Sequence, residues 1–149
     1  MNMPAIKLSV GSDLPIEEVV ELYNSVSWLA YTNDEQRPNL LKAIQNSTYV
    51  VTAWDGDKLV GLARCLSDDV SICYLQDILI HAEYQRLGLG RTMLLNCLER
   101  FAHVRMQVLI TDNEERQKRF YESLGYKNTK DLEKIPLNAY VQIKGVDLE

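Results

Sequence analysis

The sequence predicts a fold that contains both strands and helices, of the α/β or α+β class. Two observations indicate this. Apolar runs of strand length are separated by stretches in which apolar residues recur at helical spacing. The tripeptide Asp55-Gly56-Asp57 joins two of the strand-like runs and is a strong hairpin signal. Because 149 residues is a typical length for one domain, we expect residues 1–149 to form a single domain.

Composition and charge argue against several classes of protein. Hydrophobic residues make up 46% of the chain and charged residues 25%, which is ordinary for a globular domain and argues against disorder. The net charge of -5, without any run of lysines and arginines, argues against nucleic acid as a partner. No segment approaches the ~18 apolar residues of a membrane span, and residues 1–10 lack a signal-peptide pattern, so we expect no membrane association.

The cysteines indicate a reducing environment. Cys65, Cys73 and Cys97 are odd in number, lack the spacing of metal ligands and each lie within an apolar pattern. Cys65 and Cys73 carry no sequence signal of a nucleophile. We interpret all three as reduced thiols in the core, which predicts a cytoplasmic protein without a bound metal.

The N-terminal third of the chain predicts one strand and two helices. Lys7–Val10 is the expected first strand. Asp13 is expected to cap a helix that carries Pro15 in its first turn and apolar residues along one side. The stretch Ser25–Pro38 has no regular period, and a short helix is expected over Asn39–Gln45.

The middle of the chain predicts three strands followed by a helix. Tyr49–Trp54 and Leu59–Leu66 are the expected arms of the hairpin, and Val70–Ile80 is the expected third strand. The acidic pair Asp68-Asp69 is expected in the turn before it. A helix should follow from about Leu89, with a buried face at positions i, i+4 and i+7. That face comprises Leu94, Leu98 and Phe101.

The C-terminal third predicts a strand, a helix and a closing strand. Arg105–Ile110 contains a core-like apolar run and is the expected strand. Thr111 to Glu114 fits a capping box at the start of a helix, which Gly125 should end at the C′ position. Ala139–Ile143 is the best candidate for a closing strand.

A loop with two glycines lies between the third strand and the helix that follows it. Its sequence is Gln85-Arg86-Leu87-Gly88-Leu89-Gly90-Arg91. Glycine lets backbone N–H groups come close to a ligand, and the start of a helix offers unpaired N–H donors at the positive end of its dipole. The two arginines add positive charge. The loop therefore predicts a site for a diphosphate.

Two familiar phosphate loops do not fit this stretch. A dinucleotide-binding loop needs a small residue where Met93 stands. A P-loop needs Gly-Lys followed by Ser or Thr, and the chain contains no such sequence. The pattern that remains is Gln-x-x-Gly-x-Gly directly after a strand.

This pattern resembles the pyrophosphate loop of the GNAT family of N-acetyltransferases, and the resemblance covers the chain from Lys7 to about Gly125. It implies a mixed, mainly antiparallel sheet flanked by helices, in the order β-α-α-β-β-β-α-β-α-β. It also implies acetyl-coenzyme A as co-substrate, with its pyrophosphate on the loop and its pantetheine arm along the end of the third strand. The implied donor-binding residues are Ile78, Leu79, Ile80, Gln85, Arg86, Leu87, Gly88, Leu89, Gly90, Arg91 and Thr92.

A second motif supports the resemblance. Phe120-Tyr121-Glu122-Ser123-Leu124-Gly125-Tyr126 is similar to the family's Phe-Tyr-x-x-x-Gly-Phe, whose tyrosine commonly serves as general acid. A phenol with a pKa of ~10 is protonated at neutral pH and can donate a proton to a departing thiolate. The resemblance therefore implies Tyr121 as the catalytic acid. Asn113 stands one residue early for the family's pantetheine-binding asparagine and is either a donor-binding residue or a plain residue at the helix start.

The acceptor side leaves alternatives open. Asp77 is the only acidic residue in the apolar stretch Ile72–Ile80, where members of the family place a base or a water relay. It is either the catalytic base or a carboxylate hydrogen-bonded to a neighbouring loop. Trp28 and Tyr31 either line the acceptor site or fasten the irregular segment to the core.

The resemblance implies an N-acetyltransferase that moves an acetyl group from acetyl-coenzyme A to a primary amine. The acceptor would be a small molecule or a peptide, and its amine would attack the thioester directly in a ternary complex. The alternative is a non-catalytic module that binds coenzyme A for sensing or as a scaffold. Because members of the family often dimerise, a homodimer with contacts through the C-terminal strand is a further hypothesis.

Overall fold

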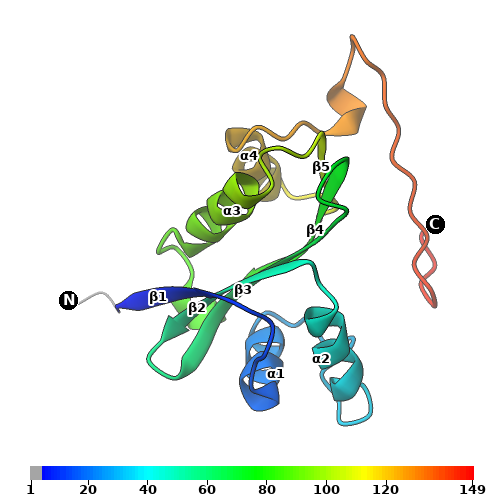
Figure 1. The fold of residues 1–149 in the computed structure, drawn as a ribbon. Coiled ribbons are helices and arrows are strands. Elements are labelled where there is room, and N and C mark those ends of the chain that lie inside the picture. Colours follow the sequence, from blue (N-terminus) through cyan, green and yellow to red (C-terminus); the bar gives the residue numbers. More distant parts are fainter. Residues whose placement is uncertain (1–4) are drawn as a thin grey trace. The chain divides into compact units, whose positions relative to one another are not determined.

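A computed structural model describes residues 5–149 (Figure 1). The chain divides into two compact units. Residues up to Ile110 form the first unit, and Thr111–Glu149 form the second. The sheet and three of the helices belong to the first unit. The single domain expected over residues 1–149 stays a prediction.

The first unit is built on a five-stranded sheet whose strands lie in chain order. The first three pairings are antiparallel, and the pairing of β4 with β5 is parallel. This mixed, mainly antiparallel sheet confirms the predicted fold class. The strands are β1 (Ile6–Val10), β2 (Tyr49–Asp55), β3 (Lys58–Ser67), β4 (Ile72–Ile80) and β5 (Met106–Leu109).

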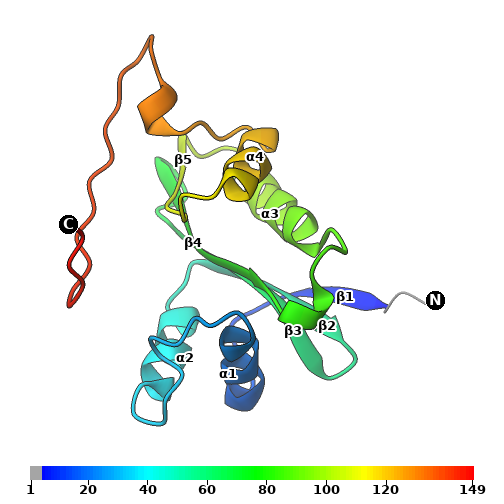
Figure 2. The same cartoon turned by 180° about the vertical axis from the view of Figure 1, so that it is seen from behind.

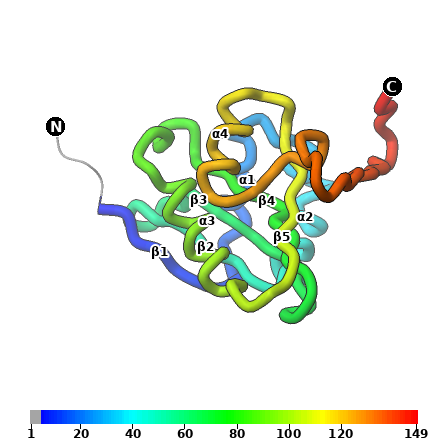
Figure 3. Tube along the Cα trace, turned by 90° about the horizontal axis from the view of Figure 1, so that it is seen from above, coloured from blue at the N-terminus to red at the C-terminus, as the bar shows by residue number. Residues whose placement is uncertain are grey.

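Helices cover both faces of the sheet. Helices α1 (Ile16–Ser25) and α2 (Arg37–Gln45) lie on one face, and α3 (Leu89–Arg100) lies on the other (Figures 1 and 2). Figure 3 shows α3 running over β2 and β3, with which it is in contact. Because β3 is covered on both faces, its residues Leu59–Ala63 are all buried. None of the helices in residues 5–149 is long and apolar enough to span a membrane.

The core follows the helical spacing of the sequence. On one face, Val19, Leu22 and Ile44 are fully buried against the sheet. On the other face, Leu94 of α3 and Phe101, the residue after the helix, are buried as predicted. Leu98 is only half-buried. The buried side of α3 is shifted towards other residues: Met93 and Cys97.

The second unit contains one helix, α4 (Glu115–Ser123), and a short 3-10 turn, η2 (Thr129–Asp131). Gly125 follows the helix at the C′ position with φ +95°, as predicted. The expected closing strand over Ala139–Ile143 is not formed. A strand needs the hydrogen bonds of a neighbour, and no strand of the described residues pairs with this segment, in which Tyr140 is 90% exposed.

Two predicted helix caps are also wrong. The first residue of α1 is Ile16, with Pro15 in the N-cap position and no side-chain cap, so Asp13 lies outside the helix start. Helix α4 has Glu114 at its N-cap, again without a side-chain cap, so Thr111 does not form the expected capping box. Capping residues mark a helix start only to within a few positions, because tertiary packing decides the first turn.

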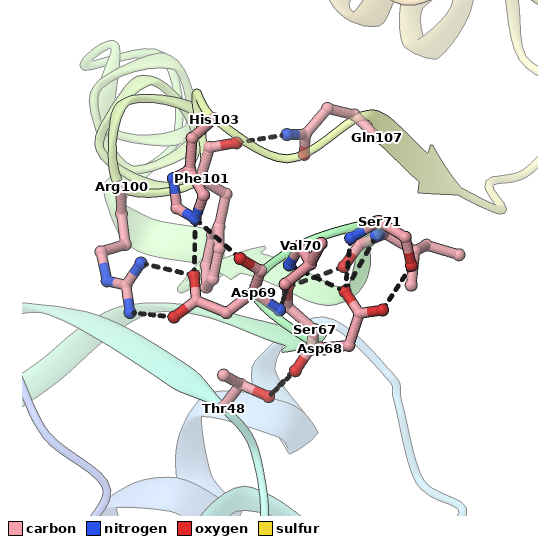
Figure 4. A network of polar contacts seen from close by, with 11 residues as sticks. Thr48, Ser67, Asp68, Asp69, Val70, Ser71, Arg100, Phe101, His103 and Gln107 are labelled. Carbon is pink, nitrogen blue, oxygen red and sulfur yellow. Dashed lines mark hydrogen bonds and ion pairs between the residues drawn. The ribbon is translucent and has the colours of Figure 1, made fainter.

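The turn between β3 and β4 is a dense polar network (Figure 4). The Asp68 carboxylate accepts hydrogen bonds from the backbone N–H groups of Val70, Ser71 and Ile72 and from the Ser71 hydroxyl. The carboxylate of the next residue, Asp69, accepts hydrogen bonds from Arg100 (3.1 Å) at the C-terminal end of α3 and from His103 (2.8 Å) just after it. The network thus ties the beginning of β4 to the end of α3.

Candidate active site

The glycine loop leads from β4 into α3. A 3-10 turn, η1 (Ala82–Tyr84), precedes it, and Arg86 and Gly88 have left-handed φ values of +68° and +78°. Gly88 is the N-cap of α3, and a Cβ built on it meets no atom within 4 Å. The Thr92 N–H bonds the Gly88 carbonyl (3.1 Å) and closes the first turn of the helix. An anion can therefore approach the start of α3 through open space beside Gly88.

The C-terminal end of the turn before the loop is anchored to the sheet. The Gln85 side chain donates a hydrogen bond to the carbonyl of Ile80 (3.2 Å). The Tyr84 hydroxyl donates to the Asp55 carboxylate at the end of β2 (2.6 Å). That bond raises the pKa of Tyr84, so its hydroxyl stays a donor. These contacts fix where the loop begins.

His81 holds the same turn from inside. Its ring is buried, and its Nδ1 accepts the N–H of Glu83 (3.2 Å). Because Nδ1 is an acceptor, the ring proton is on Nε2, which lies 3.0 Å from the carboxylate of Glu21 on α1. Lys58 balances this acidic cluster, 4.0 Å from Glu21 and 3.7 Å from Glu83. His81 is therefore a structural link between α1 and the loop.

Strand β4 has an open edge before the loop. It pairs with β5 only over Ile72–Leu75, and no strand within residues 5–149 continues that pairing towards Ile80. The His81 N–H donates to the Val60 carbonyl of β3 (2.8 Å). Backbone groups alternate in direction along a strand, so those of Ile78 and Ile80 point away from β3, towards the open edge. Ile78 and the N–H of Ile80 thus lie at the open edge, whereas the Ile80 carbonyl already accepts a hydrogen bond from Gln85 and the backbone of Leu79 faces β3.

A β-bulge marks the point where this open edge starts. Arg64 of β3 is opposite Asp77, and the next residue, Cys65, is opposite Leu75. Gln76 is therefore the extra residue of β4. Bulges bend a strand locally, and this one bends β4 directly after its last pair with β5.

Asp77 sits in an ion pair beside the bulge. Its Oδ2 accepts a hydrogen bond from Arg64 Nε (2.7 Å) and one from the hydroxyl of Tyr23 on α1 (2.9 Å). The two charged side chains are only 11% (Arg64) and 14% (Asp77) exposed. The guanidinium also donates to the Ala43 carbonyl of α2 (3.5 Å) and to the Ser47 hydroxyl just after that helix (3.3 Å). Asp77 is therefore a hydrogen-bonded carboxylate whose partners lie on β3 and α1 rather than on a neighbouring loop, and its role as the base stays a prediction.

The loop between α1 and α2 carries exposed aromatic side chains. Trp28 is 42% and Tyr31 51% exposed. The Trp28 ring packs edge-on against Tyr23, with 6.1 Å between centroids. The Tyr23 hydroxyl also donates a hydrogen bond to Asp77 of β4. The Tyr23 side chain therefore connects Trp28 with the open part of that strand.

The remaining predicted residues lie in the second unit. Tyr121 is on α4, where its ring contacts those of Phe120 (5.1 Å) and Tyr126 (5.9 Å). Burial raises the pKa of Tyr121, so the phenol is a proton donor at neutral pH. Asn113 is exposed and precedes the helix.

Two residues of the cluster around Asp77 were not predicted. Arg64 is the only charged residue in the apolar run Leu59–Leu66, just as Asp77 is in its own run. Two single charges of opposite sign in consecutive strands could have been used to predict an ion pair between these residues. Tyr23 gave no such signal, because its place on the apolar side of α1 looks like that of any core residue.

Comparisons with known proteins point in one direction. The sequence model of the acetyltransferase (GNAT) family matches residues 15–126. The N-acetyltransferase ycf52 of Pyropia yezoensis, itself uncharacterized, is 27% identical over 127 residues, which are 81% of this chain and 70% of that protein. A GNAT-family acetyltransferase of Streptococcus pneumoniae superimposes with a TM-score of 0.76 at 28% identity, over 95% of this chain and 99% of that one. An aminoglycoside N-acetyltransferase solved with CoA shares the fold alone, with a TM-score of 0.68 at 12% identity over 97% of this chain and 98% of that one.

Proposed function

Because the chain belongs to the GNAT family of acetyltransferases, we propose that it transfers an acetyl group from acetyl-coenzyme A to a primary amine of a small molecule or a peptide. The similarity to relatives named as N-acetyltransferases supports the conclusion that the chain is an acetyl-transferring enzyme. One observation carries the proposal: the open edge of β4 runs directly into the glycine loop and the start of α3. A long ligand with amide groups at one end and a diphosphate at the other matches that sequence of features.

The donor would be held mainly by backbone. Amide groups of the pantetheine arm would pair with the backbone of Ile78 and with the N–H of Ile80 at the open edge, as an added strand does. The diphosphate would take the space beside Gly88, where the helix dipole and the loop arginines favour negative charge. Gln85 supports the loop through its bond to Ile80.

The reaction we propose is direct attack. The amine nitrogen forms a bond to the thioester carbonyl carbon and loses a proton to solvent water, and the C–S bond breaks to release the coenzyme A thiolate. Tyr121 would protonate that thiolate, and a backbone N–H of the β4 edge would stabilise the carbonyl oxygen as it gains charge. The amide product then carries the acetyl group.

The three cysteines support a mechanism without an acyl-enzyme. Cys65, Cys73 and Cys97 are all buried and free. A hydrogen bond from Cys73 lowers the pKa of Cys65, but the bond to Cys97 and burial outweigh it and raise that pKa to about 12. A thiol that stays protonated is a poor nucleophile. Reduced thiols also support our proposal of a cytoplasmic location.

The acceptor would bind beside the open part of β4, against the loop that carries Trp28 and Tyr31. The exposed rings and the link from Trp28 through Tyr23 to Asp77 support this placement. Asn113 would be a further contact of the donor.

Thiol release from acetyl-coenzyme A, measured with a panel of amines, tests the proposal together with calorimetry of coenzyme A binding. We expect binding, and thiol release that depends on at least one amine. Binding without release for every amine would instead identify the non-catalytic coenzyme A module. Absence of binding would contradict the donor site itself.

A further inference from the structure

The bend of β4 needs a cause, because the donor site that we propose depends on it. The bulge at Gln76 falls directly after Leu75, the last residue that pairs with β5. A bulge at this point decides in which direction the strand edge from Ile78 onwards presents its backbone groups. A bulge is a local irregularity, so its geometry must be held by neighbouring side chains.

The side chains that flank the bulge form a closed polar cluster. Asp77 is the residue after the bulge, and its cross-strand neighbour Arg64 is the residue before the register shift in β3. The 2.7 Å bond between them spans the two strands at this position, and both side chains are mostly buried. In such surroundings the pair holds a defined geometry, because any misalignment would leave a buried charge uncompensated.

The cluster also joins the bulge to both helices on that face. Tyr23 reaches Asp77 from α1 (2.9 Å), and Arg64 reaches the Ala43 carbonyl of α2 (3.5 Å) and Ser47 just after that helix (3.3 Å). Burial, and after it Asp77, raises the pKa of Tyr23, so its hydroxyl remains the donor in this bond. The bulged segment is therefore fixed from three elements: β3, α1 and the segment just after α2.

The same contacts leave Asp77 poorly suited to act as a base. Its Oδ2 already receives two donors, one of them cationic. Taking up a proton from a substrate would break the ion pair and leave the Arg64 guanidinium buried without its counter-charge.

We propose that Asp77 is a positioning residue: with Arg64 and Tyr23 it holds the bulge at Gln76 and so sets the direction of the open β4 edge that receives the donor. The inference rests on the proposed function, since it concerns the same donor site. It assigns the three residues to donor binding, not to proton transfer.

The test is a double-mutant cycle with Asp77→Asn, Arg64→Gln and the double variant, read out by calorimetry of coenzyme A binding. Because a misplaced edge costs orientation, we expect each single variant to lower coenzyme A affinity and kcat/KM for acetyl-coenzyme A by about ten- to a hundredfold. The double variant should be no worse than either single one, because the two side chains act as one unit. The pH dependence of kcat at saturating donor should keep the wild-type profile.

Asp69→Asn is the matched control. It also removes a carboxylate from an Asp–Arg pair, but at the other end of β4, so it should leave coenzyme A affinity unchanged. Tyr23→Phe is the milder probe in case a charge variant does not fold. It removes one hydrogen-bond donor and keeps the ring against Trp28, and it should lower coenzyme A affinity several-fold.

Three outcomes are distinguishable. If Asp77→Asn binds coenzyme A like the wild type but loses an ionisation from the pH profile, Asp77 is the base and the inference is overturned. Equal coenzyme A affinity in wild type, Asp77→Asn and Tyr23→Phe, with unchanged pH profiles, would also overturn it. If the wild-type protein does not bind coenzyme A, the proposed function fails first, and the inference falls with it.

Discussion

At the scale of single residues, Gly88 is where the backbone demands one amino acid. It has φ +78°, which a residue with a branched Cβ adopts only under strain, and it borders the open space at the start of α3. We expect Gly88→Val to abolish coenzyme A binding in calorimetry, since the side chain would both strain the loop and fill that space. Gly56→Val is the control: it imposes a similar strain at φ +59° in the β2–β3 turn and should destabilise the protein while sparing coenzyme A affinity.

Tyr121 allows a sharper test of chemistry. We expect Tyr121→Phe to lower kcat by roughly ten- to a thousandfold and to leave coenzyme A affinity unchanged, because only a proton donor is lost. Tyr126→Phe, which alters the ring next to it, should keep wild-type turnover. A fully active Tyr121→Phe variant would remove this residue from the mechanism.

The sequence indicated some site residues better than others, for physical reasons. Gly88 and Asp77 stood out because glycine before a helix and a charge in an apolar strand both break a local pattern. The roles of Asp77 could not be separated in this way, because they depend on Arg64 and Tyr23, which are 13 and 54 residues away along the chain. Only the fold brings such partners together.

At the scale of elements, the β3–β4 turn has a predictable pH response. Hydrogen bonding from Arg100, and then from His103, lowers the pKa of Asp69. A carboxylate whose pKa is lower in the folded state stabilises the fold above its unfolded pKa of ~3.9 and loses that contribution as pH falls through the folded value. We expect Asp69→Asn to lower the melting temperature at pH 7, and the difference from wild type to shrink as pH falls below ~3.9 and through the lower pKa of the folded state.

The control for this prediction is the partner residue. In an Arg100→Gln background, Asp69→Asn should have a smaller effect on the melting temperature at pH 7, because the main charged partner is gone. An equal effect in both backgrounds would show that the ion pair contributes nothing to the turn.

Element types were easier to predict than their edges. The β2–β3 hairpin, α3 and the C′ glycine after α4 agree with the sequence, because turn residues and helical spacing are local signals. The bulge at Gln76 and the early end of the β4–β5 pairing did not show in the apolar run of β4, because register is decided between strands. The closing strand over Ala139–Ile143 failed for the same reason: strand propensity says nothing about the presence of a neighbour.

At the scale of the whole molecule, donor binding should appear as stability. A ligand that binds only the folded state stabilises it by ~2.7 kcal/mol at a hundredfold excess over its Kd. We therefore expect coenzyme A to raise the melting temperature in a concentration-dependent way. Pantetheine, which lacks the diphosphate, should raise it much less at the same concentration. Equal shifts for both would place the diphosphate away from the glycine loop.

The homodimer stays a hypothesis, but the contact that we expected through a C-terminal strand no longer applies. The C-terminal strand that was to provide it is not formed, although the segment carries exposed apolar side chains such as Ile135 and Val146. Sedimentation of the full chain measures the oligomeric state directly.

The open side of β4 also bears on how the protein behaves when it has no co-substrate. Unpaired backbone N–H and C=O groups at a strand edge can pair with strands of other polypeptides, and such pairing starts aggregation. A co-substrate that pairs with this edge would therefore prevent such association as well as take part in the reaction. Preparations stripped of coenzyme A should therefore scatter more light on prolonged storage than preparations that are kept saturated with it, and equal scattering would show that this edge is harmless when bare.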